Sequence, residues 1–311
     1  MAQTAFQRAL LRFRRQWILQ CFALMGIIFL IVFSYIPMFG ILIAFKDFRV
    51  RNGIIGFFTS PNVGFKWFIE FYNDLGFWNI IRNTLVLSVT KLIFIFPLPI
   101  IFAIALNELR SMKFKRFVQT VSYFPHFISW VVVSGMLFSF FNSQTGLINR
   151  LFLQLNIISQ PMTILSSPET FLPMIVWADI WKGLGWSAII FLAAITSVDQ
   201  ELYEAAIVDG AGRLRRIWNI TLPSIKGTIV ILLILNMGGL LTGNFEQSYL
   251  MGNMGNISRS EIIPTYVLKM GLAQMRYSYA TAIGLAQSFL SLLLVLFSNF
   301  IAKKISGTSL I

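Results

Sequence analysis

Two ionisable residues, Asp179 and Lys182, lie three positions apart inside a long apolar run, where a charged side chain is costly. On a helix this spacing places both on one face, where they can pair, and Gly183 and Trp186 continue that face. A carboxylate, an ammonium group and an indole suit a sugar or a uronate, because they bind its polar groups and stack on its apolar ring face. The alternative is a structural ion pair near the outer interface, with Trp186 as an interfacial aromatic residue. Three further candidates for a substrate pathway are polar residues of the next apolar run or its outer edge: Asn236, Asn244 and Gln247.

The segment 196–224 is a polar stretch between two apolar runs, and its pattern predicts a pair of short helices. Residues 201–208 are mostly helix formers, and Gly210 and Gly212 can end that helix. A second amphipathic stretch follows, to an expected break at Pro223. Small residues would let the backbone of a partner approach this pair of helices closely: Ala205, Ala206 and Gly210.

The composition requires that membrane-spanning helices position these residues. The chain is 57% hydrophobic and 12% charged, with a mean hydropathy of +0.75, whereas soluble domains carry about 25% charged residues. Its net charge of +13 comes from basic residues at the ends of apolar runs, with no compact polar domain, which argues against nucleic-acid binding. A single cysteine cannot form an internal disulfide, and a single histidine argues against a metal or triad site. We therefore expect an all-α integral membrane protein that binds membrane lipids.

Six apolar runs are long enough to cross a bilayer, which needs about 20 residues. Six spans place both termini on one side. If that side is the cytoplasm, the inner segments hold more than half of the 25 Lys and Arg residues, which predicts an N-in, C-in orientation. The expected spans are 17–45, 80–106, 117–141, 171–195, 225–241 and 280–301.

Residues 1–16 are basic and amphipathic, and either form a short interfacial helix or a disordered tail. The apolar run after them is too long for a signal peptide and has no small-residue cleavage site, so we expect a retained first span. Inside the second span Pro97 and Pro99 predict a break, as Gly238 and Gly239 do in the fifth. Such breaks either line a pathway or are static kinks.

The loop 196–224 resembles the EAA motif of ABC-importer permeases, the binding-protein-dependent sugar permease family. Three other segments, 122–132, 179–186 and 277–285, resemble permeases for complex carbohydrates of the LplB type, which include alginate and rhamnogalacturonan-oligosaccharide importers. The similarity runs from about residue 17 to the end, with Pro264 where that branch more often has Asp. The residues that match the motif are Glu204, Ala205, Ala206, Gly210, Ile220, Leu222 and Pro223. Asp209 lies between them and is a candidate for the same site.

The resemblance implies a type I ABC-importer permease fold over residues 17–311, in a bacterial cytoplasmic (inner) membrane. The loop 196–224 would be the coupling helix that docks on an ATPase. The chain would form a heterodimer with a second, homologous permease chain, joined by two copies of a cytoplasmic ABC ATPase that bind ATP and Mg. An extracytoplasmic solute-binding protein would deliver the saccharide. Related sugar permeases contact substrate from their fourth and fifth spans, which singles out Trp186 and Asn236.

The sequence itself also indicates that the chain is not an enzyme. It has no Gly-Lys dipeptide for a Walker A loop, and neither a His-Glu-x-x-His nor a Gly-x-Ser-x-Gly pattern. The rival class is a stand-alone secondary carrier or channel, in which the loop is only a linker. The sequence leaves open whether the saccharide is neutral or contains uronate.

Overall fold

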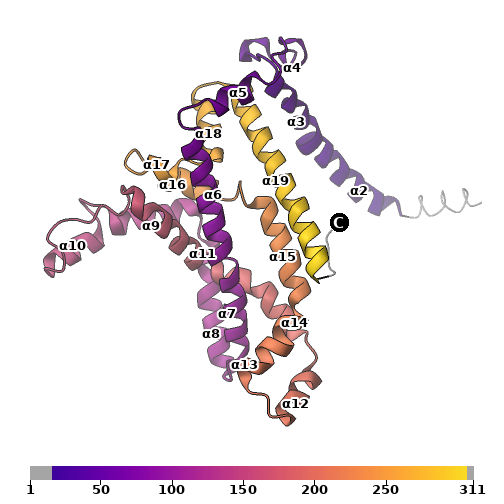
Figure 1. Cartoon of the computed structure of the whole chain (residues 1–311), viewed down its shortest axis with the longest axis vertical. Coiled ribbons are helices and arrows are strands. Elements are labelled where there is room, and N and C mark those ends of the chain that lie inside the picture. The colour runs from indigo at the N-terminus through magenta and orange to yellow at the C-terminus, as the bar shows by residue number, and fades with distance from the viewer. Residues whose placement is uncertain (1–15, 307–311) are drawn as a thin grey trace, which may run out of the picture. The chain divides into compact units, whose positions relative to one another are not determined.

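The computed structural model describes residues 16–306, with the side chains of residues 16–304, and this range contains helices and turns but no β-strand (Figure 1). The N-terminal segment expected over residues 1–16 lies, except for its last residue, outside the described residues. The described part of the chain forms two compact units. Unit 1 comprises the described part of Met1–Tyr72 together with Met270–Leu285, and unit 2 comprises Asn73–Lys269 and the described part of Ala286–Ile311.

Unit 1 begins with one long apolar helix, Trp17–Phe45, which has the length and composition of the first expected span. Pro37 lies inside it and has no N–H to donate, so the helix absorbs the missing bond by changing its winding. Within the described range, no residue of its first section, α2, is buried. In chain order the helix consists of α2 (Trp17–Leu30), a π-helical turn (Ile31–Tyr35), α3 (Ile36–Met38) and a 3-10 segment (Phe39–Phe45).

The rest of unit 1 is a small cap that closes on the start of the last helix. Arg276 forms an ion pair with Glu70, and its guanidinium lies 4.1 Å from the centre of the Tyr279 ring. The Ser278 hydroxyl accepts a hydrogen bond of 3.1 Å from the Phe48 N–H. The cap contains η3 (Val50–Asn52), α4 (Gly56–Thr59) and α5 (Lys66–Tyr72).

Unit 2 contains most of the helices and both regions singled out from the sequence. Its core forms where α7 packs against α11, and Phe96 meets Phe191 edge-on with ring centres 6.3 Å apart. Its helices are α6 (Phe77–Phe94), α7 (Pro97–Asn107), α8 (Met112–Tyr123), η4 (Phe124–Phe127), α9 (Trp130–Phe141), α10 (Leu147–Gln154), α11 (Pro168–Thr196), α12 (Gln200–Val208), α13 (Arg213–Arg216), η5 (Ile217–Thr221), α14 (Leu222–Ser224), α15 (Lys226–Gly239), α16 (Phe245–Met251), α17 (Ile257–Ser260) and α18 (Ile263–Leu268); η6 (Lys269–Ala273) and α19 (Tyr277–Ser306) run through both units.

Four helices in the described range are long and apolar enough to span a membrane by themselves, and up to six spans result if each of two bent pairs counts as one. The prolines of the second span do interrupt it, since α6 ends at Phe94 and α7 begins at Pro97. The four long helices are Trp17–Phe45, Phe77–Asn107, Pro168–Thr196 and Tyr277–Lys304.

The third expected span, 117–141, is not one straight helix. The helix up to Phe127 and the helix from Trp130 meet at 97°. Ile128 and Ser129 are extended, and the Ser129 hydroxyl caps the second helix by accepting a bond of 3.3 Å from the Val132 N–H. The apolar composition continues across this corner, which is why the sequence pattern did not reveal it.

The fifth span has its break two residues later than expected. The helix continues through Pro223 to Ser224, and a 61° bend precedes α15. The π-helical turn of Ile217–Thr221 lies just before the proline and takes up its missing N–H, as the turn before Pro37 does in the first span. At the other end, α15 stops at Gly239, in agreement with the expected glycine break.

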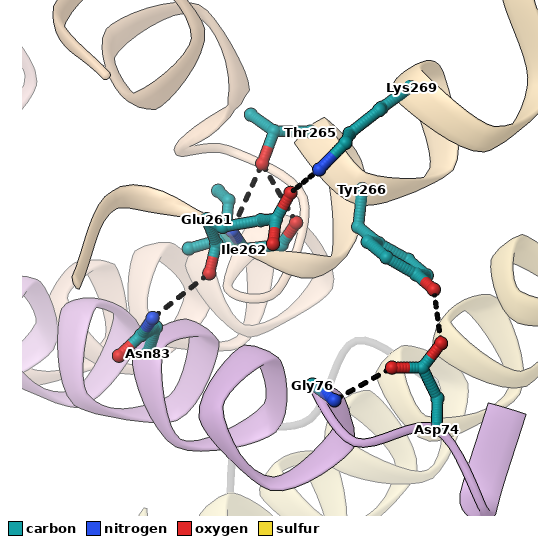
Figure 2. Close-up of polar contacts among 8 residues, drawn as sticks. All are labelled: Asp74, Gly76, Asn83, Glu261, Ile262, Thr265, Tyr266 and Lys269. Carbon is teal, nitrogen blue, oxygen red and sulfur yellow. Dashed lines mark hydrogen bonds and ion pairs between the residues drawn. The ribbon is translucent and has the colours of Figure 1, made fainter. Parts of the chain in front are cut away.

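A set of polar bonds, here called the α6–α18 latch, ties the start of α6 to the loop that leads into α18 (Figure 2). Asp74 accepts bonds of 2.7 Å from the Gly76 N–H and from the Tyr266 hydroxyl. Asn83 donates to the carbonyl oxygens of Ser258 and Glu261, at 3.0 and 3.1 Å. Pro264 lies in the first turn of α18, where no N–H is needed, and Thr265 caps that turn by accepting from the Ile262 N–H at 3.0 Å. The remaining bonds of the latch join Ile263 N–H to Thr84 Oγ1 and Lys269 to Glu261.

Candidate functional site

The loop 196–224, here called the coupling loop after the role expected for it, folds as the sequence predicts into a short helix, a tight turn and a returning helix. The Asp199 carboxylate accepts a bond of 3.0 Å from the Glu201 N–H and thereby starts α12. Gly210 ends it with φ +75°, a left-handed conformation that disfavours residues with a Cβ. In Figure 1, α12 and α13 lie at one end of unit 2, well away from α16, α17 and α18 of the same unit.

None of the residues of α12 is buried in the described part of the chain. Glu204, Ala205 and Asp209 are exposed, and Ala206 is half-buried. Large apolar side chains surround them, up to 87% exposed at Val208. Exposed apolar surface of this kind marks a contact with another protein or with a membrane. The other exposed apolar side chains of the coupling loop are Leu202, Ile207, Leu214 and Trp218.

The returning helix connects the coupling loop to the core of unit 2. Thr221 is buried, and its hydroxyl lies 2.9 Å from that of Tyr203 on α12. Leu222 packs against the α7–α11 core, Ile220 is half-buried and Pro223 is exposed. A hydrogen bond and apolar packing therefore connect α12 to the core of unit 2.

A cavity of about 750 Å³, here called the central cavity, opens within unit 2. Most of its walls are apolar, with a few polar groups converging on it, which is the usual make-up of a site for a small molecule. Of the seven sequence candidates for a substrate pathway, five line it and Lys182 and Gly183 do not. The polar and aromatic lining residues are Ser88, Lys91, Trp130, Asp179, Trp186, Ser187, Asn236, Asn244 and Gln247.

The charged centre of the cavity is a triad from three helices. The Lys91 ammonium on α6 lies 2.5 Å from the Asp179 carboxylate on α11 and also donates to the Gln247 carbonyl oxygen on α16. The Gln247 amide closes the triad by donating to Asp179 at 2.9 Å. The side chains of Lys91 and Asp179 are only 13% and 21% exposed. Lys91 was missed as a cavity residue, although an ionisable side chain inside an apolar run was the signal that could have found it.

The expected pairing of Asp179 with Lys182 is therefore wrong. Lys182 instead donates to the carbonyl oxygen of His126 at 2.7 Å and lies 5.6 Å from the centre of the Trp130 ring. His126, just before the bend in the third expected span, supplies that carbonyl oxygen. Asp179 forms its ion pair with Lys91 instead. Gly183 faces open space, since an added Cβ there would meet nothing within 4 Å.

The other candidates differ in how firmly they are held. The ring of Trp186 stacks on that of His126, with centres 4.4 Å apart and planes 2° apart. Asn236 is exposed and, among the described residues, bonds only to its own helix, at the Leu232 carbonyl. Asn244 is buried and donates to Ser88 Oγ at 3.4 Å. Trp186 and Asn236 are thus the sequence candidates whose side chains remain most available to a ligand.

The sequence matches a known family over residues 95–307, that of the binding-protein-dependent transport system inner membrane component. The chain belongs to this family, so it is a multi-pass membrane permease component and not an enzyme.

Two similar proteins come from Bacillus subtilis (strain 168). The chain is 48% identical to Protein LplB over 90% of its own length and 86% of that protein. It is 45% identical to the polygalacturonan/rhamnogalacturonan transport system permease protein YteP, over 96% and 91% of the two chains. A solved structure of a bacterial ABC transporter that imports the acidic polysaccharide alginate contains a chain with 36% identity and a TM-score of 0.87, covering 96% of this chain and 99% of that one. A second structure of the alginate transporter, in complex with an alginate pentasaccharide-bound periplasmic protein, matches with a TM-score of 0.86.

Proposed function

We propose that this chain is one half of the translocation pathway of an ABC importer for oligo- or polysaccharides in a bacterial cytoplasmic membrane. The observation that carries the proposal concerns the short helix α12. It buries none of its described residues, yet it exposes the apolar side chains of Leu202, Ile207 and Val208. An ATPase groove that receives these side chains explains why they are apolar. ATP hydrolysis then takes place on that partner, with ATP and Mg bound there.

The central cavity is the proposed saccharide path. Its wall offers two indoles for sugar ring faces and amides and hydroxyls for sugar oxygens. The alginate transporter, whose structure includes a periplasmic protein carrying a pentasaccharide, supports an extracytoplasmic solute-binding protein as the donor of the cargo. A second, homologous permease chain supplies the other half of the path.

In this mechanism the ATPases close around ATP and move α12. The bond between Tyr203 and Thr221 passes the motion to the returning helix and so to the 61° bend before α15. The six spans, oriented N-in and C-in, then rock so that the cavity opens outward and accepts the saccharide.

Reconstitution of the complete importer tests the proposal. Wild-type proteoliposomes should take up a labelled oligogalacturonate only with ATP and the loaded binding protein. The Glu204→Arg variant should insert and assemble normally but hydrolyse ATP without uptake, because the reversed charge disrupts the contact between α12 and the groove of the ATPase. Glu169→Arg, at the far end of α11, is the matched control and should transport normally. Unimpaired uptake by Glu204→Arg would contradict the coupling role.

A further inference from the structure

The central cavity contains a single cation and a single anion among the described residues that line it, Lys91 and Asp179. They belong to different helices and line the same cavity as two indoles, those of Trp130 and Trp186. A saccharide that stacks on either indole therefore shares the cavity with an ammonium group and a carboxylate.

Lys91 has hydrogen-bonding capacity left over. An ammonium group carries three N–H donors. Two are used, by the Asp179 carboxylate at 2.5 Å and by the carbonyl oxygen of Gln247. Among the described residues no third acceptor bonds to this group, and Lys91 is one of the residues that line the cavity. The third donor is thus available to an acceptor on a ligand.

The ligand acceptor that gains most at this position is a carboxylate. A bond between two ionised groups is about twice as strong as a neutral one, and the largely apolar wall strengthens it further. Asp179 acts in the opposite sense, because it stands beside Lys91 and repels a second carboxylate. A carrier benefits from this opposition, since cargo that is held too tightly does not leave.

We propose that Lys91 is the specificity-determining residue of the cavity and binds the carboxylate of a uronate-containing saccharide, while Asp179 limits how tightly that carboxylate is held. This inference rests on the proposed function and names its substrate class. It differs from a structural ion pair in one respect that can be measured. Removal of either partner weakens a structural pair, whereas here removal of Lys91 and removal of the Asp179 charge change acidic-substrate affinity in opposite directions.

The test uses the complete importer in proteoliposomes with two labelled probes, trigalacturonate and its fully methyl-esterified form. The apparent affinity for each probe is measured for wild type, Lys91→Met, Lys91→Arg and Asp179→Asn. The same binding protein delivers the cargo to every variant, so its own preference cancels when a variant is compared with wild type. Lys91→Met should lower the preference for the acid over the ester about tenfold, the loss of one charge-assisted bond. Lys91→Arg should keep the preference, and Asp179→Asn should raise it several-fold.

Equal losses for both probes in Lys91→Met and Asp179→Asn would overturn the inference, because the pair would then be structural. If Lys91→Met does not assemble, Lys91→Arg and Asp179→Asn still decide: a preference that fails to rise in Asp179→Asn contradicts the opposing role of that carboxylate. Absence of ATP-dependent uptake of either probe by wild type would instead overturn the proposed function, and the inference with it.

Discussion

The hydroxyl groups of Tyr203 and Thr221 lie 2.9 Å apart and join α12 to the helix that returns from it to the membrane. Thr221 is buried and Tyr203 half-buried, so this bond is partly shielded from water. The two residues are 18 positions apart in the sequence. The coupling loop is therefore braced across its width, and a displacement of α12 away from the returning helix would break this bond.

Removal of this brace should weaken coupling without disrupting the fold. Tyr203→Phe deletes one hydroxyl and leaves Thr221 without its partner, a loss of about 1 kcal/mol. We expect normal insertion and a lower number of saccharides transported per ATP hydrolysed, measured in proteoliposomes. Tyr35→Phe, at an exposed position of the first span, should leave that ratio unchanged. Identical ratios for both variants would show that the brace does not transmit motion.

The turn after α12 should depend on the left-handed backbone of Gly210. An alanine there adds strain of about 1–2 kcal/mol, whereas asparagine tolerates this conformation. Gly210→Ala should lower ATP-dependent uptake, and Gly210→Asn should restore most of it. Gly212→Ala is the control, since φ at Gly212 is −66° and an added Cβ meets nothing within 4 Å. If both alanine variants behave alike, the turn geometry is not what matters.

Two glycines of α11 should respond in opposite ways to alanine. A Cβ at Gly185 would lie 2.3 Å from the carbonyl oxygen of Ser122 on α8, and such overpacking costs about 1–3 kcal/mol. At Gly183 the added methyl meets open space and favours the helix by about 0.5–1 kcal/mol. Thermal unfolding of the purified importer in detergent should show a lower midpoint for Gly185→Ala and an equal or higher one for Gly183→Ala. A lower midpoint for both would contradict the close approach of α8 and α11.

The α6–α18 latch should contribute stability, whereas the cavity amide should contribute to transport. Asn83→Ala leaves the carbonyl oxygens of Ser258 and Glu261 without a donor and should destabilise unit 2 by about 1–3 kcal/mol. Asn236→Ala removes an exposed side chain that is bonded, within the described part of the chain, only to Leu232 of its own helix, so the unfolding midpoint should hardly change. Its effect should appear in the apparent affinity for saccharide. Unfolding midpoints and uptake measured on both variants separate the two roles, and the reverse pattern would contradict the assignment.

The sequence predicted what depends on local pattern and missed what depends on distant contacts. Apolar runs located the helices that are long and apolar enough to span a membrane, and glycine and helix-forming residues located α12 and the turn at Gly210. The 97° corner at Ser129 was missed because apolar residues continue on both sides of it. The partner of Asp179 was wrong because spacing along one helix favoured Lys182, three residues away, and gives no information about Lys91 on another helix.

The central claim, that α12 docks on a separate ATPase, is tested most directly by cross-linking in the assembled importer. The chain has one cysteine, Cys21, so a Cys21→Ser background allows a single reactive thiol at Ala205→Cys or, as a control, at Met254→Cys in an exposed loop of unit 2. With a short heterobifunctional reagent that joins a thiol to a lysine amine, Ala205→Cys should form one covalent product with the ATPase subunit, in a yield that changes with ATP, and Met254→Cys should form none. If Ala205→Cys remains unlinked and reacts equally with a water-soluble maleimide whether or not the ATPase is present, α12 does not dock there and the account is contradicted.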